Sequence, residues 1–143
     1  MQDYLIRALT TNKEIRALAV RSTALVEEAR KSHNTSPVAT AALGRALSGA
    51  LLMGSMIKGG DEIKLIFEGD GPLGRIIAEA NQHGEVRGYV NNPQPPLQLN
   101  MEGKLDVAAA IGHGQLRVVK SKLLKSSYES SVPLVSGEIA EDL

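Results

Sequence analysis

The chain has 143 residues, of which 43% are hydrophobic and 22% are charged, a balance typical of roughly one folded domain with a real core. Lysine plus arginine and aspartate plus glutamate both number 16, so no net positive field exists to collect nucleic acid, and one Phe, three Tyr and no Trp leave few side chains for base stacking. Because cysteine is absent, this chain can hold no disulfide, no thiolate metal site and no redox-sensing thiol.

The first part of the chain predicts a β-hairpin followed by a helix. Residues 4–9, "YLIRAL", and residues 14–20, "EIRALAV", resemble strands and flank the polar turn "TTNK". From Ser22 to Ser32 the apolar residues recur at helical spacing on one side, so we expect an amphipathic helix. The opening residues lack the basic region, apolar run and cleavage site of a secretory signal, which predicts a cytoplasmic protein.

A second helix is predicted to begin at Ser36, whose side chain can cap free N–H groups, with Pro37 at the first helical position. Apolar and small residues lie all around it up to Ile57, which indicates an element covered on most sides. The stretch could span a bilayer by length. Arg45 near its middle would cost about 2.5 to 3.5 kcal/mol there, so we expect a buried helix and no membrane partner. Snorkelling or pairing with a carboxylate is favoured for Arg45 over ligand binding.

The stretch "GDGPLG", Gly69–Gly74, matches the glycine fingerprint of dinucleotide-binding folds and follows a predicted strand at Glu62–Gly69. The next segment, Arg75–Asn81, alternates like a strand and ends at a turn, too early for the crossover helix that the fingerprint requires. No acidic residue lies between Glu85 and Glu102 to bind a ribose. We therefore interpret Gly69–Gly74 as a hairpin turn and keep a nucleotide-binding enzyme as an alternative function.

The remaining elements complete the fold class. Further strands are predicted at Glu85–Val90, Gln115–Lys120 and Val132–Ser136, with a proline-rich loop over Asn91–Asn100 and a short helix within Lys104–Gly112. The strands do not alternate regularly with helices. We therefore expect an α+β fold in which an antiparallel or mixed β-sheet packs with a largely buried central helix and an adjacent amphipathic helix.

No residue is assigned a catalytic, cofactor-binding or metal-binding role. His33, His83 and His113 are far apart in the sequence and adjoin loop residues, so we expect solvated histidines. The "SMIK" of Ser55–Lys58 matches an acylating serine motif by chance, because its companion motifs are missing. A modest basic run is explained as well by a solvated face as by a phosphate partner. It consists of Arg117, Lys120, Lys122 and Lys125.

Several motifs together resemble the N-terminal domain of the bacterial redox-regulated holdase chaperones, the thirty-three-kilodalton heat shock protein family. They occur in order along the chain: "DYLIRAL", "ALGRAL", "EGDGPLG", "GEVRGYV", "GKLDVAAAIG" and "VSGEIAEDL". The resemblance implies an ATP-independent, non-enzymatic chaperone that holds unfolding proteins during heat and oxidative stress in the cytoplasm and is able to dimerise. It assigns no client-binding residues.

The chain departs from that family in one respect. Members of the family carry a linker and a small domain whose cysteines bind zinc when reduced and form disulfides when oxidised, and this chain has no cysteine. We therefore expect residues 1–143 to form a single N-terminal chaperone domain, incomplete at its C-terminal end, without zinc or the redox switch. Uncovered apolar residues at Pro133–Val135 predict a homodimer or a complementing C-terminal segment. A module that binds peptides by pairing strands remains the second alternative.

Overall fold

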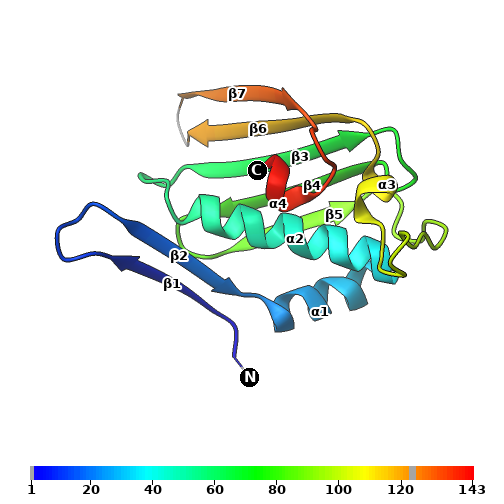
Figure 1. Cartoon of the computed structure of the whole chain (residues 1–143). Coiled ribbons are helices and arrows are strands. Elements are labelled where there is room, and N and C mark those ends of the chain that lie inside the picture. The colour runs from blue at the N-terminus through cyan, green and yellow to red at the C-terminus, as the bar shows by residue number, and fades with distance from the viewer. Residues whose placement is uncertain (1, 123–124) are drawn as a thin grey trace.

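The computed structural model describes residues 2–122 and 125–143 (Figure 1). Within them, a five-stranded antiparallel sheet carries helices on one face, and a separate two-stranded hairpin projects from one end. The fold class is α+β, as predicted. The elements in chain order are β1 (Tyr4–Leu9), β2 (Arg16–Arg21), α1 (Thr23–His33), α2 (Pro37–Gly54), β3 (Glu62–Gly69), β4 (Arg75–Asn81), β5 (Val86–Val90), α3 (Val107–Ile111), β6 (Gly114–Lys122), β7 (Lys125–Pro133) and α4 (Ile139–Asp142).

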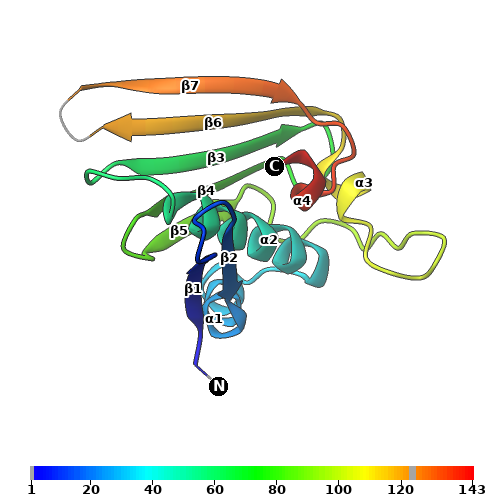
Figure 2. The same ribbon diagram turned by 60° about the vertical axis from the view of Figure 1, so that its left-hand side comes forward.

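The strands of the sheet are ordered β5-β4-β3-β6-β7, and every neighbouring pair is antiparallel. In the central strand β3, Leu65 stands directly opposite Ala78 of β4 and Val118 of β6. Because side chains alternate between the two faces of a strand, this register places Leu65, Ala78 and Val118 on the face that α2 covers. Figure 2 shows α2, α3 and α4 on that same side of the sheet.

Helix α2 is the central helix that the sequence predicted. Its N-terminus is capped as expected, since the Ser36 hydroxyl accepts a hydrogen bond from the N–H of Ala39. Small residues let it approach the sheet closely, and a Cβ added at Gly54 would lie 2.9 Å from the carbonyl oxygen of Asn81 in β4. The helix ends at Gly54, before the predicted end at Ile57. Among the described residues, no helix is long and apolar enough to cross a membrane.

The prediction of a strand at Val132–Ser136 was wrong in its position. Strand β7 spans Lys125–Pro133, so only Val132 and Pro133 of the predicted segment belong to it. The sequence "KSSYESS" has no apolar alternation, because β7 pairs only with β6 in the described structure and is largely exposed on both faces. After Pro133 the chain turns inward, and the short helix α4, which was not predicted, buries Ile139 to 1% exposure.

Candidate functional site

The loop Gly69–Gly74 connects β3 to β4 as the predicted hairpin turn. Its backbone N–H groups are already used, because those of Asp70, Gly71 and Leu73 donate to the carbonyl groups of His113, Ile111 and Ala110 at 2.8–3.0 Å. The N–H of Gly74 donates to Gly71 within the loop. A phosphate bound by this motif would need those same donors. The glycines therefore let the loop pack closely against α3, a structural role.

The three histidines lie apart on the surface. His33, His83 and His113 are all exposed, as predicted. Across residues 2–122 and 125–143, no group of three or more His, Asp or Glu side chains is arranged to hold a metal ion. The Ser55 hydroxyl of "SMIK" donates to the carbonyl oxygen of Leu52 at 2.7 Å and so closes the end of α2. None of these residues assembles a catalytic group.

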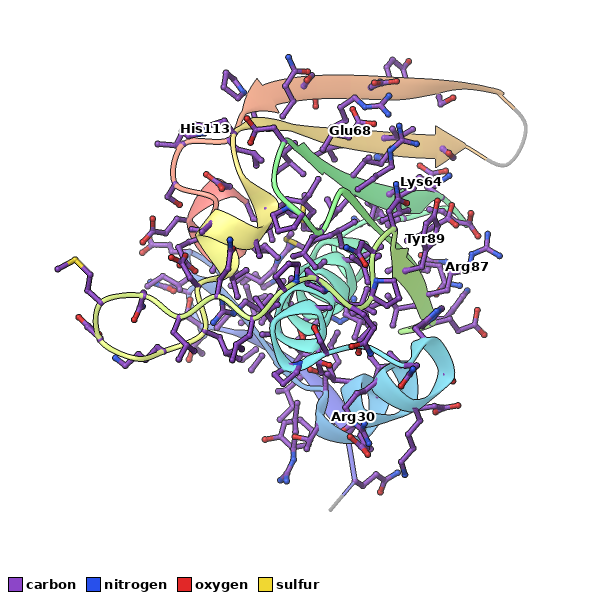
Figure 3. The ribbon with its side chains drawn as sticks, turned by 90° about the vertical axis from the view of Figure 1, so that its right-hand side faces the viewer. Arg30, Lys64, Glu68, Arg87, Tyr89 and His113 are labelled. Atoms are coloured by element: carbon purple, nitrogen blue, oxygen red, sulfur yellow. The ribbon has the colours of Figure 1, made fainter. Side chains whose placement is uncertain are left out.

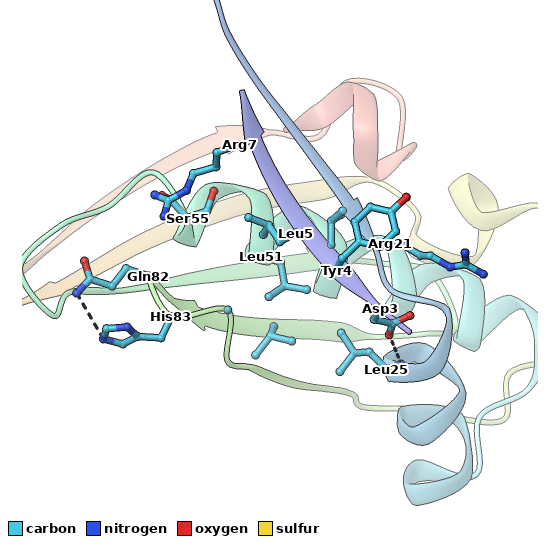
Figure 4. Close-up of a pocket in the computed structure, with 13 residues that line it drawn as sticks. Asp3, Tyr4, Leu5, Arg7, Arg21, Leu25, Leu51, Ser55, Gln82 and His83 are labelled. Carbon is cyan, nitrogen blue, oxygen red and sulfur yellow. Dashed lines mark hydrogen bonds between the residues drawn. The ribbon is translucent and has the colours of Figure 1, made fainter. Parts of the chain in front are cut away.

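A mixed pocket of about 520 Å³ lies between the β1–β2 hairpin, the C-terminal half of α2 and the β4–β5 turn (Figure 4). Two of its charged side chains, Asp3 and Arg7, are bonded to backbone groups. Asp3 accepts hydrogen bonds from the N–H groups of Ala24 and Leu25 at 3.1 and 2.8 Å, which lowers its pKa and caps α1. Arg7 donates to the carbonyl oxygen of Ser55 at 3.1 Å. These hydrogen bonds therefore anchor the hairpin to α1 and to the end of α2.

The sheet face that points away from α2 carries cross-strand ion pairs (Figure 3). Glu68 of β3 accepts from Arg75 of β4 at 2.7 Å and from Arg117 of β6 at 3.0 Å. Arg117 also donates to Glu129 of β7 at 3.0 Å, and hydrogen bonds to both carboxylates raise its pKa. The chain of pairs therefore runs across four adjacent strands, from Glu129 to Arg75.

This network accounts for part of the basic run found in the sequence. Arg117 is neutralised by its two carboxylates, and Lys120 lies 3.7 Å from Asp61. The side chains of Lys122 and Lys125 lie outside the described part of the structure. Toward β5, Glu79 pairs in the same way with Lys64 and Arg87. The outward face of the sheet therefore carries balanced ion pairs on either side of an apolar row formed by Ile66, Ile77 and Tyr89, which stand opposite one another in β3, β4 and β5.

A second, mainly apolar hollow lies on the outward side of α2, between α1 and α4. It has a volume of about 1090 Å³, and we call it the α2 groove. Most side chains around it are apolar or small, and Leu52, Met53 and Met56 gather where α2 ends. The residues that line it are Ser22, Thr23, Val26, Glu27, Pro37, Thr40, Ala41, Gly44, Arg45, Ser48, Gly49, Leu52, Met53, Met56, Ile139, Ala140 and Leu143.

Small residues on α2 form the floor of the α2 groove. Gly44 lies against Val26 of α1, and a Cβ added at Gly44 would sit 2.9 Å from a methyl carbon of that valine. On the other side, a Cβ added at Gly49 would sit 2.5 Å from the side chain of Leu143. Helices that pack on glycine approach closely, so α1 and the α4 segment form two walls on either side of a shallow floor.

Charged groups of the α2 groove are paired at its two rims. On α1, Arg30 donates hydrogen bonds to both carboxylate oxygens of Glu27 at 2.8 Å and lowers the pKa of Glu27 to about 2. On the opposite rim, Arg45 pairs with Glu138 at 3.2 Å, and both side chains are about half exposed. Pairing with a carboxylate was one of the two outcomes expected for Arg45. The rims are thus charged but balanced around an apolar floor.

The sequence did not predict the α2 groove. The helix was expected to be covered on most sides, and the face toward the sheet is indeed buried. The outward stripe is only partly covered, because α4 is short and α1 crosses near the N-terminal half of α2 (Figure 1). The sequence did show that Ala41, Gly44, Ser48 and Leu52 lie on one face of the helix. It could not show which segments pack on that face or how much of it they leave open.

Comparison with known proteins places the chain in a family. The family model described as Hsp33 protein matches residues 3–143. The chain is 54% identical over 142 residues to the 33 kDa chaperonin of Desulforamulus reducens, covering 99% of this chain and 48% of that protein. It is 47% identical over 141 residues to the 33 kDa chaperonin of Bacillus subtilis, covering 98% of this chain and 48% of that protein.

A solved structure gives the same result in three dimensions. The crystal structure of the 33 kDa chaperonin from Thermotoga maritima at 2.20 Å resolution superposes with a TM-score of 0.92 at 46% identity. The match covers 96% of this chain and 48% of that chain, so the chain spans about half the length of the relatives it matches. These relatives are named as chaperonins, and none of the names denotes an enzyme. The chain belongs to the Hsp33 family.

Proposed function

We propose that this domain is an ATP-independent holdase, which binds unfolding proteins in the cytoplasm during heat and oxidative stress. Membership of the Hsp33 family supports this proposal. The observation that carries it is the α2 groove, an apolar hollow of about 1090 Å³ with balanced charges at its rims. Clients would bind there through their apolar segments.

A holdase needs a surface that accepts unfolded chains of unrelated sequence. An unfolded chain presents apolar side chains in no fixed arrangement, so its partner gains free energy mainly by removing apolar area from water, at about 25 cal/mol per Å². A shallow groove with small residues on its floor and methionine side chains at one end accepts different side chains, because methionine is flexible and polarizable. The charged rims keep such a surface soluble.

This chain has no thiol-based redox response. The sequence has no cysteine, so neither the zinc site nor the disulfides that the family resemblance implies can form from these residues. Any protection by this domain is therefore expected to be constitutive. Client binding would not depend on the thiol–disulfide balance of the buffer.

The test is light scattering of a chemically unfolded, unrelated client that is diluted into buffer with and without the domain. We expect suppression of scattering without ATP, to the same extent in a thiol-specific oxidant and in thiol reductant. Bovine serum albumin at equal mass serves as the control for nonspecific crowding. Scattering equal to that control, or protection that requires a reductant, would contradict the proposal.

We also propose that the domain works as a homodimer or with a complementing segment. Strand β7 pairs on one side only within the described structure, and Val135 just beyond it is 91% exposed. An unpaired strand edge beside apolar side chains favours pairing with another chain. Sedimentation should detect a dimer or a complex, and a sharply melting monomer over the whole usable concentration range would contradict this.

The same edge supports a second candidate, a module that binds peptides by adding a strand to β7. The two functions differ in selectivity. A strand-pairing module would bind one short peptide and leave unrelated unfolded clients unprotected, whereas a holdase would protect several clients of unrelated sequence. Titrating a set of unfolded clients against the domain separates the two.

A further inference from the structure

Methionine supplies all the sulfur of this chain, because cysteine is absent. Of its four methionines, Met1 lies outside the described residues, and Met53, Met56 and Met101 lie within them. Met53 is near the end of α2 and Met56 follows just after it, and both line the α2 groove. Met101 belongs to the loop between β5 and α3 and does not line the groove. The α2 groove therefore brings two oxidisable side chains together.

The three described methionines differ in their access to solvent. Met101 is fully exposed and Met56 is 47% exposed, whereas Met53 is half-buried and packs against the core. An oxidant must reach the sulfur atom before it can react, so the rate of oxidation follows exposure. We therefore expect Met101 to be oxidised first, Met56 next and Met53 last. Met56 is the groove methionine that can react while the core stays intact.

Oxidation would change the chemistry of the groove surface. Hydrogen peroxide transfers one oxygen atom to the thioether: a sulfur–oxygen bond forms, the peroxide O–O bond breaks, the sulfur is oxidised and the peroxide is reduced to water. The product, methionine sulfoxide, is polar where methionine was apolar. An apolar client segment lying on Met56 would remove the new oxygen from water and offer it no donor, which weakens binding. Arg45, which lines the groove, is already paired with Glu138.

We propose that Met56, with Met53 beside it, is a modification site whose oxidation by peroxide switches off client binding in the α2 groove. The inference rests on the holdase function proposed above and names a regulation of that same site. Protection needs no activation in a chain without cysteine, so oxidation acts here in the direction of loss. Methionine sulfoxide reductases, one for each epimer of the sulfoxide, would restore the apolar surface, whereas a thiol reductant alone would not.

The test compares two variants that each keep a different set of methionines. The double variant Met53→Leu and Met56→Leu keeps the groove apolar at similar volume but removes its sulfur, and Met101→Leu removes only the exposed sulfur of the loop. Each protein is treated with hydrogen peroxide and then freed of it, and mass spectrometry of its peptides identifies the oxidised positions. Light scattering of an unfolded client compares treated and untreated forms of the same protein, so any effect of leucine itself cancels.

We expect peroxide to raise the concentration needed for half-suppression by about tenfold in the unsubstituted domain and in Met101→Leu, as for the loss of a contact inside a binding surface. The double variant should show no such change. In oxidised Met101→Leu, the sulfoxide reductases should restore protection, and thiol reductant alone should not. In a time course, protection should fall together with the oxidation of Met56 and later than the oxidation of Met101.

Three results would overturn the inference while leaving the holdase proposal intact. The first is an equal loss of protection in the oxidised double variant. The second is unchanged protection by Met101→Leu once its peptides show Met56 to be fully oxidised. The third is a loss of cooperative thermal unfolding in that oxidised variant, because the core and not the groove surface would then have failed. Absence of protection before any oxidation would instead overturn the holdase proposal, and this regulation with it.

Discussion

Gly69 of β3 lies so close to Ile111 of α3 that a Cβ added to the glycine would stand 1.9 Å from the carbonyl oxygen of the isoleucine. That oxygen accepts the N–H of Gly71 two residues later, which fixes the loop against the helix. A motif that looks like a nucleotide fingerprint is therefore a packing contact between two elements. Gly69 and Gly71 are required because backbone atoms of α3 lie against them, and Gly74 is required by its positive φ of 70°.

Gly69→Ala should destabilise the domain by at least about 3 kcal/mol, at the upper end of the cost of overpacking, because a backbone carbonyl cannot yield as a side chain can. Gly84→Ala is the matched control. Gly84 has a φ of 80° but nothing within 4 Å of an added Cβ, so only the left-handed backbone costs energy, about 1 kcal/mol. Urea unfolding measures both. Equal losses of unfolding free energy in the two variants would show that the carbonyl group of Ile111 can move to make room for a Cβ at position 69.

The glycine loop should also give no response to nucleotides. A ligand present at 100 times its dissociation constant raises stability by about 2.7 kcal/mol, which a melting experiment detects easily. We expect no shift of Tm with millimolar ATP, NAD or GTP, because the loop donors are bonded to carbonyl groups. A clear rise in Tm would restore the nucleotide-binding alternative.

Asp3 should stabilise the start of α1 in a pH-dependent way. The N–H groups of Leu25 and Ala24 lower its pKa in the folded state, so its contribution is fully present above the unfolded pKa of about 3.9 and is lost as the pH falls through the folded pKa. Asp3→Ala should therefore lower Tm at pH 7 and have little effect in strong acid. Gln2→Ala is the control, and an effect of Asp3→Ala that stays constant with pH would contradict the capping role.

The ion pairs on the outward sheet face should contribute more than isolated surface pairs. Glu68 bonds to two arginines from neighbouring strands, and the side chains of Glu68 and Arg117 are 33% and 29% exposed. Glu68→Gln should lower Tm, and the loss should shrink in 1 M salt, where the Debye length is about 3 Å. Glu102→Gln breaks a pair whose side chains are 70–75% exposed and should change Tm little. Equal shifts for the two variants would refute the distinction.

Local chemistry made much of the fold predictable. The serine–proline start of α2, the alternation in β3 and β4 and the turn at Gly69–Gly74 each follow from short-range rules. Strand β7 was not predicted correctly because it is an edge strand with polar residues on both faces. Its sequence therefore has no alternation of apolar and polar residues. Helix α4 is short and depends on Asp142 binding N–H groups several residues earlier.

The α2 groove was unpredictable for a different reason. The groove exists because the neighbouring segments leave part of α2 uncovered. Its walls, at Val26 and Leu143, come from segments far apart in the sequence. The helical spacing of small residues indicated close packing on more than one side of α2, which the contacts at Gly44 and Gly49 confirm. It could not indicate that the space between those two contacts stays open.

The central claim is that the α2 groove is the surface that holds clients, and one comparison of two variants tests it most directly. Met56 lines the groove and is 47% exposed, while Leu97 lies away from it in the loop after β5 and is 68% exposed, so a glutamate at either position should leave the core intact. In the light-scattering assay, Met56→Glu should raise the concentration for half-suppression by about tenfold, as expected for a contact inside a binding surface, and Leu97→Glu should not change it. Full protection by Met56→Glu would contradict the account, and a loss in Leu97→Glu would locate client binding elsewhere.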